Sequence, residues 1–171
     1  ELDFSRPILA SGNPENVSFR DDIRDWRRIA KHMYVWDYTV NFNHYLAIHP
    51  NLEAIHGNAA FFRDAGVTCL FEEGIVGPHA AFSELKGWLC SKLMWDADQP
   101  AGPLVEKFVR AYYGPAADLA RADFDEIHAF PRGGERDPVL IYERVTATNY
   151  PDAFFERSAA RWAEATKRVA D

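Results

Sequence analysis

The segment HMYVWDY, residues 32–38, decides the predicted fold class of this chain. Its β-branched and aromatic residues are typical of a strand that is buried on both faces. A helical pattern, with apolar residues three or four positions apart, precedes it over residues 19–31. A second helical pattern follows over residues 51–65, and Gly66 stands just past its end, where a left-handed cap is expected. A second short strand is then predicted for VTCLFEE, residues 67–73.

A third helix is predicted from about residue 79 to residue 95, so that residues 19–95 alternate helix, strand, helix, strand, helix. This alternation is typical of parallel sheets and of α/β barrels. Two strands cannot form an independent α/β sheet, and a complete (β/α)8 barrel needs roughly 250 residues. Because the chain has 171 residues, we predict an α/β fold in which residues 1–98 are the C-terminal portion of a TIM barrel. The N-terminal remainder of that barrel would then be a partner. A two-layer fold with a swapped or missing partner would fit the same pattern.

Residues 99–171 are predicted to form a small helical region after the barrel portion. Helical patterns run over residues 104–113, 116–129 and 151–169. An alternative for the whole chain is a mainly helical interaction domain, in which the two apparent strands are buried helix segments.

The composition excludes several classes of function. The chain is 47% hydrophobic and 26% charged, which suits a folded domain with a core. Its formal net charge of −7 argues against nucleic acid or an anionic membrane surface as the main partner, and no apolar run is long enough to span a bilayer. Two cysteines, Cys69 and Cys90, are too few for a disulfide framework or a four-thiolate zinc site. The sequence has no His-Glu-x-x-His pattern and no phosphate-binding glycine loop, so neither a metal nor a cofactor is expected.

Carboxylates end both predicted strands. Asp37 lies at the end of the first strand, and Glu72 and Glu73 end the second. In α/β barrels the reactive groups lie where strands end, and a pair of acids at this rim is what glycoside hydrolysis requires. The alternation of a strand lets only one of the two glutamates point inward, and this parity alone does not choose between them. Alternatively, an acid that follows a strand caps the next helix or pairs with an arginine.

The residues around the first strand end suit a neutral polyol ligand. Trp36 and Tyr38 offer aromatic faces, and the loop that follows adds amide and imidazole donors from Asn41 and His44. An ordinary packed loop is the alternative interpretation of this segment.

A set of short motifs, taken in order, resembles one known family. The motifs are Tyr34–Tyr38, Asn58 with Phe61-Phe62 and Gly66-Val67, Phe71–Gly74, Leu89 with Lys92–Asp96, and Tyr112–Ala116. From about residue 13 to residue 130 the chain resembles the bacterial domain-of-unknown-function family 4838, part of which is classed as glycoside hydrolase family 163.

The resemblance implies a TIM-barrel glycosidase, with endo-β-N-acetylglucosaminidase activity on N-glycans and an exported or periplasmic setting. It also implies that Trp36–Tyr38 and Phe71–Gly74 are strand ends at the substrate face. Because the family often has Gln at the position of Glu73, it favours Glu72 as the essential acid.

The leading hypothesis is therefore a glycoside hydrolase whose substrate is an oligosaccharide or glycan. Its catalytic residues would be Asp37, Glu72 and Glu73, and its substrate-binding residues would be Trp36, Tyr38, Asn41 and His44. Retaining, inverting and substrate-assisted mechanisms all remain compatible with the sequence. A non-catalytic carbohydrate-binding module and a helical interaction module are the alternatives.

Overall fold

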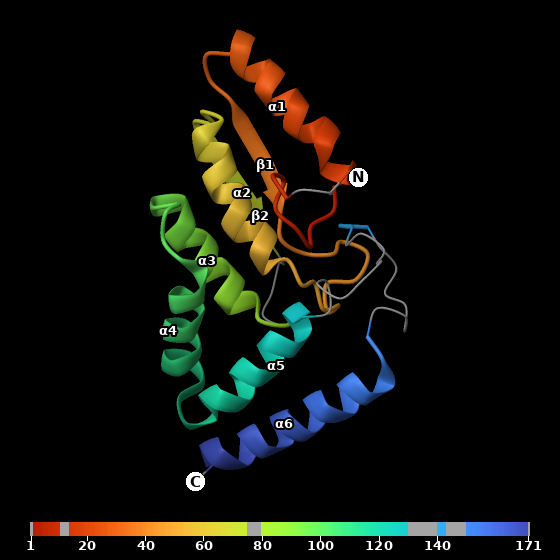
Figure 1. Cartoon of the computed structure of the whole chain (residues 1–171). Helices are drawn as coiled ribbons and strands as arrows, with labels where there is room; N and C mark the ends of the chain where they lie inside the picture. The colour runs from red at the N-terminus through yellow and green to blue at the C-terminus, as the bar shows by residue number, and fades with distance from the viewer. Residues whose placement is uncertain (1, 11–13, 75–79, 130–139, 143–149, 171) are drawn as a thin grey trace.

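The computed structural model of the chain describes residues 2–10, 14–74, 80–129, 140–142 and 150–170. Every helix and strand predicted from the sequence is present in these ranges and in the expected order (Figure 1). The main elements are α1 Val17–Ile29, β1 Tyr34–Tyr38, α2 Leu52–Asp64, β2 Cys69–Glu73, α3 Ser83–Trp95, α4 Ala101–Tyr113, α5 Ala117–Ala129 and α6 Asp152–Ala170. Two 3-10 turns, Pro14–Asn16 and Gly114–Ala116, precede α1 and α5. The start predicted for the third helix, His79, lies outside the described residues.

The end of α2 confirms the predicted left-handed cap. Gly66 has a φ of 76°, a conformation that glycine adopts without steric penalty. Its N–H donates to the Arg63 carbonyl, and the next N–H, that of Val67, donates to the Phe62 carbonyl, both at 2.9 Å. This pair of bonds is the Schellman arrangement, which satisfies the last carbonyls of the helix and turns the chain toward β2.

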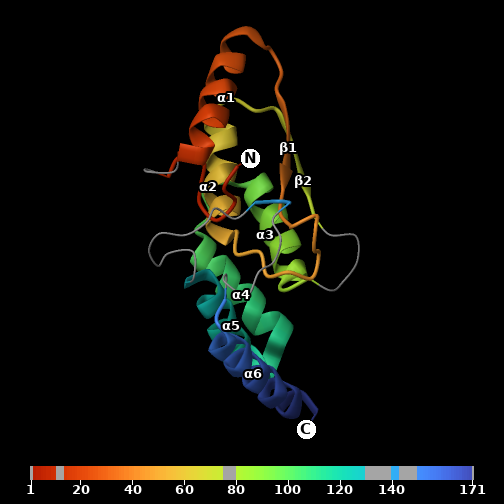
Figure 2. The ribbon, with the colours of Figure 1, turned by 90° about the vertical axis from the view of Figure 1, so that its right-hand side faces the viewer.

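The two strands pair in parallel, joined by α2. Their register runs from Tyr34 opposite Cys69 to Tyr38 opposite Glu73. Because side chains alternate along a strand, register partners share a face. The face that carries Val35 packs on the helices, and Figure 2 shows α1, α2 and α3 on that side of the strand pair.

The prediction of a TIM-barrel portion is wrong. The described residues are mostly helical and contain one pair of short parallel strands, so they hold no series of β/α units that could form part of a barrel wall. A single strand–helix–strand crossover, covered by helices on one side, already accounts for the alternation over residues 19–95. Without a barrel portion, the expectation that the barrel's N-terminal remainder is a partner loses its basis. The alternative of two buried helix segments is also wrong, since both segments pair as strands.

The strands are not buried on both faces, contrary to the sequence prediction. Val35 is buried, but its neighbours Tyr34 and Trp36 are 57% and 53% exposed. Segment 32–38 therefore has one side that faces the core and one aromatic side that no described residue covers fully.

Among the described residues, three hydrophobic clusters hold the helices together, and α3 takes part in two of them. The first joins α1, α2 and the strands through Ile23, Val35, Phe61 and Phe62. The second joins α2 to α3 through Ile55, Ala59, Leu89 and Leu93. The third joins α3 to α4, α5 and α6 through Leu85, Val105, Val109, Phe124 and Phe154. The division into domains at residue 98 stays a prediction.

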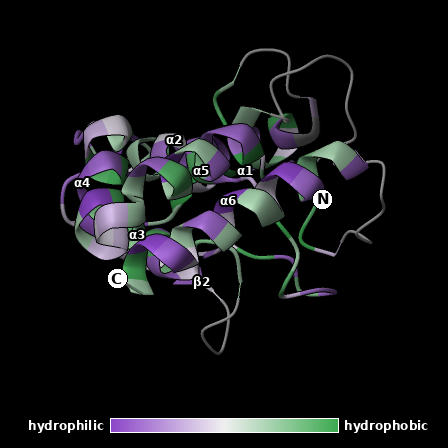
Figure 3. Cartoon of the chain, turned by 90° about the horizontal axis from the view of Figure 1, so that it is seen from below, coloured by the Kyte–Doolittle hydropathy of each residue, from purple (hydrophilic) through white to green (hydrophobic). Residues whose placement is uncertain are grey.

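The C-terminal helices follow the amphipathic pattern expected from the sequence. Seen from below, α6 alternates hydrophilic and hydrophobic residues along its length (Figure 3). Phe154 is fully buried against the α3–α5 cluster, while Arg157 and Arg161 form ion pairs with Glu126 of α5. In the part of the chain that the structure describes, no helix has the length and apolar character needed to cross a membrane.

Candidate functional site

Asp37 and Glu72 are register partners on adjacent strands, so both side chains point toward the helical layer. Asp37 is 6% exposed. Its carboxylate accepts a hydrogen bond from the Tyr38 backbone N–H at 2.9 Å and another from the Asn58 side chain. Burial raises the pKa of Asp37 to about 6, against the smaller opposing effect of these two hydrogen bonds.

Asn58 of α2 holds Asp37 in place from the helical side. While its amide donates to Asp37, its Oδ1 accepts the backbone N–H of Ile8 at 2.9 Å. The same buried side chain therefore connects the N-terminal segment, α2 and the end of β1.

Glu72 is the less buried member of the pair, yet its carboxyl group is mostly removed from water. Its Oε2 atom is buried and has no hydrogen-bond partner among the described residues. Burial, and then the charge of the neighbouring Asp37, raise the pKa of Glu72 to about 8. Two carboxyl groups at one register position of a buried strand pair disfavour each other's ionisation, and the pKa of Glu72 is raised further than that of Asp37.

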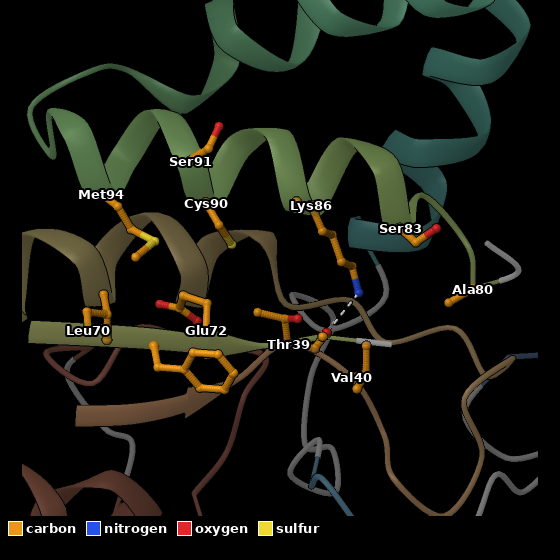
Figure 4. Close-up of a pocket in the computed structure, with 13 residues that line it drawn as sticks. Thr39, Val40, Leu70, Glu72, Ala80, Ser83, Lys86, Cys90, Ser91 and Met94 are labelled. Atoms are coloured by element: carbon orange, nitrogen blue, oxygen red, sulfur yellow. Dashed lines mark hydrogen bonds between the residues drawn. The ribbon is translucent and has the colours of Figure 1, made fainter. Parts of the chain in front are cut away.

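A cavity of about 370 Å³ lies between β2 and α3, and Glu72 lines it from the strand side (Figure 4). The side chains of Lys86, Cys90 and Met94 reach toward it from α3, and Thr39 lines it from the segment after β1. Asp37 does not line the cavity; it lies opposite Glu72 on the neighbouring strand.

Lys86 is a buried lysine that the sequence analysis did not predict. Its Nζ donates to the carbonyl of His49 at 2.7 Å and to that of Thr39 at 3.3 Å, and burial lowers its pKa to about 7. In the described ranges Lys86 forms no ion pair. The signal in the sequence is that Lys86 lies between Phe82 and Cys90 at four-residue spacing, on a stripe where only apolar residues are expected.

The Cys90 thiol has low nucleophilic reactivity. Burial, and then the nearby Glu72, raise its pKa to about 12, so the nucleophilic thiolate does not form near neutral pH.

The opposite face of the strand pair carries an aromatic surface. Trp36 and Phe71, which are register partners, pack edge to face with ring centroids 4.9 Å apart, and Phe71 is 42% exposed. The Trp36 indole N–H donates to Glu73, which fixes that carboxylate on the open face. Tyr38 packs against Phe42 at 5.4 Å from the same side of β1.

The sequence-predicted site residues thus divide into separate groups. Asp37 and Glu72 lie together beside the cavity, whereas Glu73, Trp36 and Tyr38 lie on the open face. The remaining two, Asn41 and His44, do not line the cavity. The buried Asn41 side chain accepts the N–H of Asn43 within its own loop, and His44 is exposed in that loop.

In the described ranges no three His, Cys, Asp or Glu side chains lie close enough together to bind a metal ion. The chemistry of the site is that of its carboxyl groups, its lysine and its aromatic surface.

Fold and site together define a mainly helical protein with a β–α–β unit, in which a buried carboxyl pair lies beside a cavity. Residues 1–125 match the sequence model of the family described as "Domain of unknown function (DUF4838)", and the chain belongs to this family. This confirms the resemblance drawn from the ordered motifs. No curated protein and no solved structure matches the chain.

Proposed function

We propose that this protein hydrolyses a glycosidic bond in a glycan, with Glu72 as the acid that protonates the leaving oxygen. The observation that supports this most directly is the state of the Glu72 carboxyl group. It lines the cavity, one of its oxygens is buried without a hydrogen-bond partner in the described ranges, and Asp37 lies at the same register position. A carboxylic acid kept neutral near pH 7 beside a cavity is what a general acid needs.

In the proposed step the bond between the anomeric carbon and the leaving oxygen breaks, and the Glu72 proton moves to that oxygen. Either water attacks the anomeric carbon directly, or an N-acetyl oxygen of the substrate attacks it first and water then opens the ring that forms. In both routes the proton that the water loses restores the acid form of Glu72, directly or through solvent. Asp37 acts as a positioning residue, because its charge adds to the larger effect of burial in raising the pKa of Glu72. The aromatic surface around Trp36 would bind sugar rings that extend beyond the cavity, past the edge of β2 that no described strand pairs with.

The test is hydrolysis of an N-glycan glycopeptide by the wild-type protein and by Glu72→Gln, followed by mass spectrometry of the released glycan. Removal of a general acid costs about 10²- to 10⁴-fold in rate, so we expect Glu72→Gln to lose at least 100-fold. Glu53→Gln, at an exposed position on α2, is the matched control and should keep its activity. Equal rates for all three proteins would contradict the proposal.

A second candidate function is glycan binding without turnover, which the exposed Trp36–Phe71 surface favours. Aromatic rings that are about half exposed and rigidly packed offer large contact area at low entropic cost. Measurable glycan affinity in the wild-type protein, together with no released product, would favour this function over hydrolysis.

A further inference from the structure

Lys86 is a buried cation without a countercharge in the described part of the chain. It is 8% exposed and forms no ion pair there, yet a buried ammonium is costly unless an anion compensates it. Its two hydrogen bonds, to the carbonyls of Thr39 and His49, use two of the three ammonium protons. The third proton has no acceptor among the described residues, and Lys86 lines the 370 Å³ cavity.

The same cavity holds a second group that lacks a partner. The Oε2 atom of Glu72 is buried and accepts no hydrogen bond in the described ranges. Burial and the charge of Asp37 raise the pKa of Glu72 to about 8, so its carboxyl group can offer its one proton to the glycosidic oxygen of a ligand. The first turns of α3, including Ser83 and Lys86, also line the cavity, and the positive end of a helix dipole favours an anion.

We propose that this cavity binds the carboxylate of an acidic sugar, with the Lys86 ammonium as its countercharge. This deepens the proposed glycosidase function, on which it rests, by naming the charged group of the substrate. In this arrangement the carboxylate of the sugar contacts Lys86 from inside the cavity, while Glu72 lies within reach of the glycosidic oxygen.

Charge and size both favour a sugar carboxylate over a larger or more highly charged anion. The cavity offers one cation among its described lining residues, and Asp37 on the neighbouring strand adds a negative charge, so a monoanion is better compensated than a dianion. A volume of about 370 Å³ is near the lower end of the range for small-molecule sites, roughly 300–1,000 Å³. That space suits a single sugar unit.

The affinity should depend on pH through the groups around Lys86, which are Glu72, Asp37, Cys90 and His49. Lys86 loses its charge above a pKa of about 7, and Glu72 loses its donor proton above a pKa of about 8. Cys90 stays a neutral thiol, and burial beside Lys86 keeps the His49 imidazole neutral by lowering its pKa. We therefore expect carboxylate affinity to fall at least tenfold between pH 6 and pH 8.5.

The experiment is isothermal titration of the purified protein with glucuronate, glucose, acetate and inorganic phosphate at pH 6. We expect glucuronate to bind at least tenfold more tightly than glucose, acetate or phosphate. Lys86→Met should lose at least tenfold in glucuronate affinity, while Lys107→Met, at an exposed position on α4, should keep it. If Lys86→Met does not fold, the preference of the wild-type protein for glucuronate over glucose and its pH dependence decide the question.

Other outcomes overturn the inference. Equal affinity for glucose and glucuronate would show that the site does not recognise the carboxylate. Equal affinity for acetate and glucuronate would show that it does not recognise the sugar. A preference for phosphate would show that the ligand is not a carboxylate. Hydrolysis of a neutral glycan without glucuronate affinity would reject this inference and leave the proposed function standing. Lysine-dependent glucuronate binding without any hydrolysis would support the site and reject the glycosidase.

Discussion

Asp37 and Glu72 stand opposite each other on the parallel strands β1 and β2, and both side chains lie under the helices. Neighbouring strands are about 4.8 Å apart, so the two carboxyl groups share one environment with little water. Asp37 is enclosed by α2 and Glu72 opens to the cavity beside α3. The pair therefore combines one enclosed carboxylate with one accessible acid.

Glu72→Gln should stabilise the protein increasingly as the pH rises from about 5 to 8. The pKa of Glu72 is about 8 in the folded state against an ordinary value of 4.5. Between these values the folded protein holds a proton that the unfolded chain has released, so its stability falls with rising pH, whereas a glutamine has no such dependence. The gain should approach at most about 1.4 kcal/mol per pH unit. Urea unfolding at pH 5, 6.5 and 8 measures it.

Urea unfolding of Asp37→Asn at the same three pH values tests how much the Asp37 charge contributes to the pKa of Glu72. Without the Asp37 charge, part of the shift in the Glu72 pKa is lost, and the pH dependence should become shallower. A stability difference between wild type and Glu72→Gln that stays constant with pH would contradict the raised pKa.

Asn58→Ala should destabilise the fold by about 2–4 kcal/mol, since it removes a hydrogen bond from each of two buried groups at roughly 1–3 kcal/mol each. The two groups are the Asp37 carboxylate and the Ile8 N–H. Asn43→Ala, at an exposed position in the loop after β1, should cost less than about 1 kcal/mol. Thermal unfolding of both variants checks this, and equal effects would show that Asn58 is not a buried connector.

Trp36→Ala should weaken glycan binding at least tenfold with a small cost in stability. The indole is about half exposed, and its main contacts are Phe71 and Glu73 on the open face. Trp95→Ala is the control, because Trp95 is 90% exposed at the end of α3. Glycan titrations followed by tryptophan fluorescence measure both affinities. If Trp95→Ala weakens binding as much as Trp36→Ala does, the aromatic surface on the strands is not the binding surface.

Gly57→Ala and Gly87→Ala should change stability in opposite directions although both glycines lie inside helices. A Cβ at Gly57 would lie 2.5 Å from the Pro7 Cβ, whereas a Cβ at Gly87 meets nothing within 4 Å. We expect Gly57→Ala to cost about 1–3 kcal/mol through overpacking. Gly87→Ala should gain about 0.5–1 kcal/mol through helix propensity. Chemical unfolding of the two variants measures this, and a gain at Gly57 would contradict the close packing of the N-terminal segment on α2.

By itself the sequence determined the local elements and the chemistry available at the strand ends. The helices, both strands and the Gly66 cap follow from spacing, alternation and turn residues, which act within a few positions of each other. The order of the motifs also identified the family correctly. These features can be predicted from the sequence alone because they depend on the geometry of residues close together in the chain.

The tertiary structure alone decided which carboxyl groups meet and which face stays open. The strand register pairs Asp37 with Glu72 and places Glu73 on the other side, a choice that alternation within one strand left undecided. Lys86 reaches the Thr39 carbonyl across 47 residues of sequence, and the absence of a barrel in the described ranges likewise depends on long-range strand pairing. Strand register, burial and the packing of helices on the strands arise from contacts between distant segments, so a local sequence pattern cannot predict them.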